Sequence, residues 1–78
     1  MAEVEVKTLF SKDRRRKVEF IRREDGTFSF VEWRLLAEEN AWSPFGRRPA
    51  SIRDSLDRAE AEARARVDWL ASGDQADR

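Results

Sequence analysis

Gly26 and the two acidic residues before it separate two runs rich in β-branched and aromatic residues, 17–23 and 27–37. Glycine adopts the positive backbone φ that a tight chain reversal needs, and branched or aromatic side chains favour strands. The sequence therefore predicts an antiparallel β-hairpin. This feature constrains the fold most strongly, because it fixes two strands and their relative direction together.

Charge pairing distinguishes two registers for this hairpin. A two-residue turn would place Glu19 opposite Glu32, and like charges on neighbouring strands destabilise a sheet. A three-residue loop with Gly26 in the left-handed region instead places Phe20 opposite Phe30. We therefore expect the second register.

In the second register both faces of the hairpin carry apolar side chains, because successive residues of a strand point to opposite faces. One face presents Val18, Phe20, Phe28 and Phe30. The other face presents Ile21, Val31, Trp33 and Leu35. A single helix can cover only one face, so the N-terminal segment, a loop or a partner must cover part of the other.

The segments that precede and follow the hairpin in the chain are candidates for two further strands. Residues 41–48 are expected to return as a third strand at an edge, because Pro44 has no backbone N–H to donate to a sheet. Valine alternates with charged residues from position 4, which is typical of a half-buried strand. Residues 1–12 are thus expected to form either a fourth strand or a flexible arm.

A C-terminal helix is predicted near residues 54–71, with its N-cap left open among Ser51, Asp54 and Ser55. Apolar residues at spacings of three and four predict its buried stripe, which comprises Leu56, Ala59, Ala63, Val67 and Leu70. Gly73 is expected to end the helix, and residues 73–78 to form a disordered tail.

The fold class expected from these elements is α+β, in one domain spanning residues 1–78. It comprises a three-stranded antiparallel β-meander, with or without a fourth N-terminal strand, and one C-terminal helix packed on one face.

Composition excludes most catalytic chemistry. The chain of 78 residues has no His, Cys or Tyr, and its 16 Lys and Arg balance its 16 Asp and Glu. It therefore lacks the usual nucleophile and base pairs, metal-ligand spacings and a glycine-rich phosphate loop. We expect a protein that is not an enzyme and uses no cofactor, metal or small-molecule substrate. An acidic start and the lack of a long apolar run predict a cytoplasmic protein without membrane contact.

The first functional hypothesis is a protein-interaction module that binds a partner or itself. Apolar groups on both hairpin faces motivate it, because exposed apolar patches are typical of interaction sites. Large aromatic side chains supply much of the binding energy at such sites. The expected anchors are Trp33, Trp42, Phe45 and Trp69.

Trp69 differs from the other expected anchors because it belongs to the predicted helix, where it lies about 120° from the centre of the apolar stripe. It is expected either to fold over the edge of the stripe onto Trp42 or Phe45, or to be an exposed aromatic side chain.

Nucleic-acid binding through the basic segment 12–23 is the alternative hypothesis. Basic residues interleaved with aromatic ones can contact phosphates while bases stack. The residues that would make the contacts are Arg14, Arg15, Arg16, Lys17, Arg22 and Arg23.

The order of several short features also resembles a group of small bacterial sheet-plus-helix proteins of unknown function. The features are Arg22 with Asp25, Gly26, Thr27 and Phe28, then Trp42 with Pro44, then Asp54 and Ser55 leading into an alternation of alanine and glutamate over 59–63, and finally Trp69 with Leu70. The resemblance implies a sheet-plus-helix fold and a bacterial origin. It implies no activity and assigns no residue a role.

Overall fold

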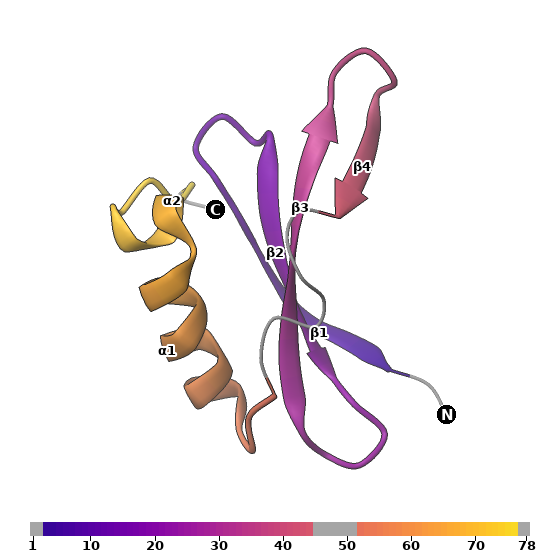
Figure 1. Ribbon diagram of the computed structural model, residues 1–78, viewed down its shortest axis with the longest axis vertical. Helices are drawn as coiled ribbons and strands as arrows, with labels where there is room; N and C mark the ends of the chain where they lie inside the picture. The colour runs from indigo at the N-terminus through magenta and orange to yellow at the C-terminus, as the bar shows by residue number, and fades with distance from the viewer. Residues whose placement is uncertain (1–2, 45–51, 77–78) are drawn as a thin grey trace.

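The computed structural model describes residues 3–44 and 52–76. One antiparallel sheet is formed, in spatial order, by β1 (Val4–Phe10), β2 (Arg16–Arg22), β3 (Phe28–Leu36) and β4 (Ala41–Pro44). The helices α1 (Leu56–Arg66) and α2 (Asp68–Ala71) follow, and α1 packs against β2 and β3 (Figure 1). The predicted α+β class is confirmed, and the N-terminal segment is a fourth strand. Part of the predicted strand 41–48 lies outside the described residues.

The central hairpin has the predicted register. Phe20 lies opposite Phe30, and Arg22 lies opposite Phe28. Gly26 has a φ of 86°, in the region that glycine adopts without strain. The Asp25 carboxylate closes the loop by accepting hydrogen bonds from the Thr27 backbone N–H at 3.0 Å and the Thr27 hydroxyl at 2.6 Å. The hydrogen bonds within the loop and the pairing of β2 with β3 therefore both support the predicted register.

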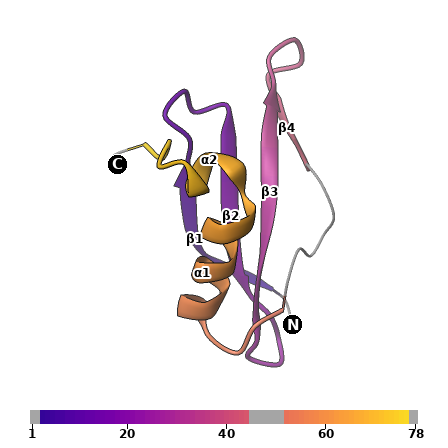
Figure 2. The same ribbon diagram turned by 60° about the vertical axis from the view of Figure 1, so that its left-hand side comes forward.

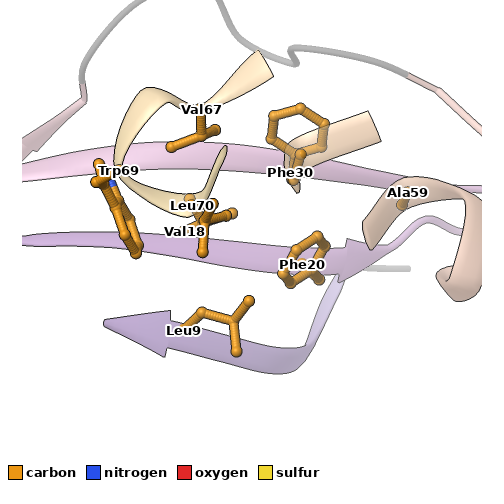
Figure 3. Close-up of a cluster of buried hydrophobic side chains, with 9 residues drawn as sticks. Leu9, Val18, Phe20, Phe30, Ala59, Val67, Trp69 and Leu70 are labelled. Carbon is orange, nitrogen blue, oxygen red and sulfur yellow. The ribbon is translucent and has the colours of Figure 1, made fainter. Parts of the chain in front are cut away.

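The hydrophobic core lies between the helices and one face of the sheet (Figure 3). Val18 and Phe20 are fully buried, and Ala59 and Ala63 of α1 are also completely inaccessible to solvent. These two small residues let the helix backbone approach the aromatic rings of the sheet. Leu56, predicted to be buried, is half-buried and packs at the edge of the core.

The C-terminal helix is divided, which differs from the continuous helix predicted over 54–71. Val67 has extended backbone angles, φ −88° and ψ 116°, so α1 ends there and α2 begins on a new axis. Of the three candidate N-caps, Ser55 has this role, because its side chain accepts the Arg58 backbone N–H at 3.2 Å.

A disordered tail was predicted over 73–78; residues 73–76 make backbone hydrogen bonds, and residues 77–78 lie outside the described residues. Gly73, at φ 81°, turns the chain back toward the end of β1. The Lys12 backbone N–H donates to the Asp74 carbonyl at 3.0 Å, and the Ala76 N–H donates to the Phe10 carbonyl at 2.8 Å. Residues 74–76 therefore pair with the start of the β1–β2 turn.

Candidate functional site

The two faces of the sheet have different surroundings. Among residues 3–44 and 52–76, both helices lie on the same side of the sheet (Figure 2). Strand β1 pairs edge to edge with β2, so it widens the sheet and does not cover the opposite face. No described helix covers that face, which we call the helix-free face.

Three aromatic side chains gather at one end of the helix-free face, and we call Phe10, Trp33 and Trp42 the aromatic patch. They come from β1, β3 and β4 and are all half-buried. The rings of Phe10 and Trp42, from the two edge strands, have centroids 6.3 Å apart and an interplanar angle of 58°. This tilted arrangement is favourable for aromatic rings.

A lysine and a glutamate hold the aromatic patch together. The Lys17 ammonium lies 4.6 Å from the ring centroid of Trp42 and 6.0 Å from that of Trp33. The same ammonium pairs with the Glu19 carboxylate at 3.0 Å, and Glu19 also accepts the Trp33 indole N–H at 3.1 Å. The Lys17 side chain is only 16% exposed, so its attraction to the rings is weakly screened by water. The rings of Trp33 and Trp42 are therefore held in place by contacts within the chain.

The β1–β2 turn places Arg14 at the rim of the aromatic patch. The Asp13 carboxylate accepts the Ser11 hydroxyl at 2.7 Å and the Arg15 backbone N–H at 3.0 Å. These two hydrogen bonds lower the pKa of Asp13, the Ser11 bond contributing most. The ordered turn holds Arg14 in the left-handed region at φ 59°, with its guanidinium carbon 5.3 Å from the Phe10 ring centroid. Both Arg14 and Arg15 are exposed.

The patch occupies only part of the helix-free face. Toward the other end of β3, Ser29 and Val31 are buried, with 2% and 5% of their surfaces exposed. The accessible aromatic surface is therefore confined to the end of the sheet nearest the β1–β2 turn.

The predicted anchors are divided by the structure. Trp33 and Trp42 both belong to the aromatic patch, whereas Phe45 lies outside the described residues. Phe10 was not predicted to be an anchor, because the ring that it contacts, that of Trp42, is distant in the sequence and lies on the opposite edge strand.

The expectations that Trp69 packs on Trp42 or is exposed are wrong, and the alternative contact with Phe45 lies outside the described residues. Trp69 is 5% exposed, belongs to the core beside Val18 and Leu70, and donates its indole N–H to Glu32 at 3.2 Å (Figure 3). The helix break at Val67 changes the direction of Trp69, so a calculation with uninterrupted helical geometry misplaced it. Trp69 is not part of the aromatic patch.

The six predicted nucleic-acid contacts do not form one surface. Arg16 faces the helices, where it contacts Asp68 at 3.5 Å, whereas Lys17 belongs to the patch on the opposite face. Arg22 and Arg23 lie at the far end of β2, roughly 20 Å from Arg16 at about 3.3 Å per residue. Arg23 pairs there with Glu3 at 3.8 Å. Because successive residues of β2 point to opposite faces of the sheet, the basic side chains are divided between those two faces.

A polar hollow of about 450 Å³ lies on the helix side of the sheet. Its lining comprises Ser11, Asp13, Arg16, Asp68, Trp69, Ser72 and Asp74. The Asp68 side chain is 84% exposed, so the hollow is open to water and gives little desolvation to a ligand. Within the described part of the chain, no three potential metal-ligating side chains are grouped closely enough to hold an ion.

Glu32 is the one described acidic group whose pKa is raised. Partial burial raises this pKa above the ordinary value of 4.5, while the Trp69 hydrogen bond and the nearby Arg16 charge oppose the shift. The folded state therefore binds the Glu32 proton more tightly than the unfolded state does. As the pH falls from neutral to about 4.5, the contribution of Glu32 to the free energy of unfolding must rise.

Glu32→Gln is expected to remove this pH dependence while keeping an oxygen acceptor for Trp69. The stability of the variant minus that of the natural chain should be largest near neutral pH and should fall as the pH approaches 4.5. Asp13, Asp25 and Glu62, whose pKa values are lowered, are common to both proteins and cancel in this difference. Urea unfolding of both proteins at a series of pH values measures this difference in stability. A difference that grows on acidification would contradict the raised pKa of Glu32.

Comparison of the chain with protein-family models, curated proteins and solved structures gave no match in any of the three. The described helices include none long and apolar enough to span a membrane. The case for a function therefore depends on the geometry of the aromatic patch.

Proposed function

We propose that this chain is a small, non-catalytic protein-interaction module that binds its partner through the aromatic patch. The observation that carries the proposal is the position of Trp33 and Trp42 with Phe10 on the helix-free face, outside the hydrophobic core. Aromatic side chains that remain partly accessible are typical anchors of protein interfaces.

The order within the patch supports this function. Lys17 lies over the Trp42 ring, Glu19 accepts the Trp33 indole N–H, and Lys17 and Glu19 form an ion pair. Because these contacts already hold both tryptophan side chains, binding would immobilise few additional rotatable groups. Pre-organised side chains lose less conformational entropy on association than mobile ones. A small protein can therefore gain useful affinity from a small contact area.

Nucleic-acid binding is less well supported by the geometry. The basic residues are divided between two faces and two ends of β2, and Arg16, Lys17 and Arg23 each have an acidic partner. A nucleic-acid surface typically needs its cations along one continuous track.

Trp42→Ala tests the proposed function. The purified natural chain is expected to retain a specific protein from an extract of its native host, or to associate with itself in sedimentation velocity as its concentration rises. Trp42→Ala should reduce that association about tenfold or more, because truncation of a central aromatic anchor has effects of this size.

Arg58→Ala is the control, because Arg58 is exposed on α1, away from the helix-free face. It should associate as the natural chain does. Equal association by Trp42→Ala, or a strict monomer that retains no protein, would contradict the proposed function.

A further inference from the structure

We infer that the partner of the aromatic patch is a second copy of this chain, packed face to face through the helix-free faces of the two sheets about a two-fold axis roughly parallel to the strands. This inference rests on the proposed function and names the partner that the same surface takes. Its basis is the opposite charge of the two turns that lie at the patch end of the sheet.

The two turns at this end of the sheet carry opposite charge. The β1–β2 turn, residues 11–15, has three basic residues and one acidic residue, a balance of +2. The β3–β4 turn, residues 37–40, has Glu38 and Glu39 and no basic residue, a balance of −2. All of these charged residues are exposed. Because the sheet is an antiparallel meander, both turns lie at the same end, one beside each edge strand (Figure 1).

The acidic residue of the β1–β2 turn does not reverse this polarity on the helix-free face. Asp13 lines the polar hollow on the helix side of the sheet, as do Asp68 and Asp74. The Arg14 guanidinium, in contrast, lies over the ring of Phe10 in the aromatic patch. The helix-free face therefore has a basic corner at β1 and an acidic corner at β4.

A two-fold axis roughly parallel to the strands brings the opposite corners together. Most homodimers have two-fold symmetry, in which the same surface of each copy forms the interface. When two sheets pack face to face about this axis, β1 of each copy lies over β4 of the other, and the turns stay at the same end. Each basic β1–β2 turn then meets the acidic β3–β4 turn of the second copy. A two-fold axis across the strands would instead carry the turns of the two copies to opposite ends and separate their charges.

The aromatic patch and the net charge favour the same arrangement. The patches of the two copies face each other, so their contact removes accessible apolar surface of Phe10, Trp33 and Trp42 from water. The 16 basic and 16 acidic residues give the chain no net charge, so no overall repulsion opposes the approach of two copies. The opposite charges of the turns then set the orientation of the copies.

Reversing the charge of one turn at a time tests this inference, with sedimentation velocity over a wide range of concentrations as the measurement. The natural chain is expected to form dimers that dissociate more readily as salt is added. Lys12→Glu with Arg15→Glu makes both turns acidic, and Glu38→Lys with Glu39→Lys makes both turns basic. Each double variant alone should self-associate about tenfold more weakly, because like charges then meet across the interface.

An equal mixture of the two double variants gives the sharpest result. Each acidic turn of one variant meets a basic turn of the other, so the mixture should form heterodimers about as strongly as the natural chain forms dimers. A folding defect in either variant cannot produce this rescue. The matched control, Arg58→Glu with Arg64→Glu, changes the net charge equally at exposed positions of α1. It should dimerise much as the natural chain does at physiological salt, where distant charges are screened.

The remaining outcomes separate this inference from the proposed function. A natural chain that stays monomeric at every concentration would overturn the second copy as the partner. Capture of a different protein in a way that depends on Trp42 would then leave the proposed function standing, and its failure would overturn both. Dimers that neither charge reversal weakens, or a mixture that does not restore association, would overturn the face-to-face arrangement.

Discussion

Replacing Phe20 by alanine is expected to lower the free energy of unfolding by about 3–5 kcal/mol, the range found when a large buried side chain is truncated in a core. Phe20 is completely inaccessible to solvent and stacks at a tilt on Phe30 across the hairpin, with ring centroids 6.1 Å apart. A chain of 78 residues has a total stability of roughly 4–12 kcal/mol, so the variant should be largely or partly unfolded.

Phe20→Leu keeps most of the apolar volume and is expected to cost about 1 kcal/mol, which keeps the comparison measurable if the alanine variant fails to fold. Urea unfolding followed by far-ultraviolet circular dichroism measures both variants. A loss below about 1 kcal/mol for Phe20→Ala would show that the core between β2, β3 and α1 is misassigned.

Trp69→Ala is expected to have a loss of similar size, about 3–5 kcal/mol. The substitution removes a buried ring from the core and also the indole N–H that the half-buried Glu32 accepts. Trp42→Ala, on the helix-free face, should cost less than about 2 kcal/mol, because its side chain is only half-buried.

The order of these two losses distinguishes the roles of the tryptophans. Unfolding monitored by circular dichroism is preferable to fluorescence, because each substitution removes a fluorophore. A greater loss for Trp42→Ala than for Trp69→Ala would place Trp42 in the core and contradict the assignment of an accessible aromatic patch.

Local features of the sequence predicted the central hairpin correctly. The position of Gly26 and the avoidance of a Glu19–Glu32 pair selected the register that places Phe20 opposite Phe30. Strand alternation then assigned Phe20 and Trp33 to opposite faces, as the structure shows. These predictions succeeded because neighbouring residues and adjacent strands determine them.

The errors arose where distant contacts determine the structure. The apolar spacing continues through Val67, so nothing in the periodicity indicated that the helix ends there and that Trp69 turns into the core. The pairing of Ala76 with Phe10 depends on backbone hydrogen bonds, which side-chain pattern does not reveal.

The composition of the candidate site was only partly predictable for the same reason. Trp33 and Trp42 were predicted to be anchors from their residue type, but their connection through Lys17 depends on the order of the strands. Phe10 joins them because rings from the two edge strands meet across the face of the sheet.

Site-specific photo-crosslinking in the native host tests the central claim most directly. A photoreactive phenylalanine analogue placed at Trp42 lies in the aromatic patch, whereas the same analogue at Ala61 lies on an exposed position of α1. We expect irradiation to join position 42, but not position 61, to a discrete protein or to a second copy of the chain. Crosslinking from position 61 alone, or to nucleic acid from position 42, would contradict the claim that the helix-free face is a protein-interaction surface.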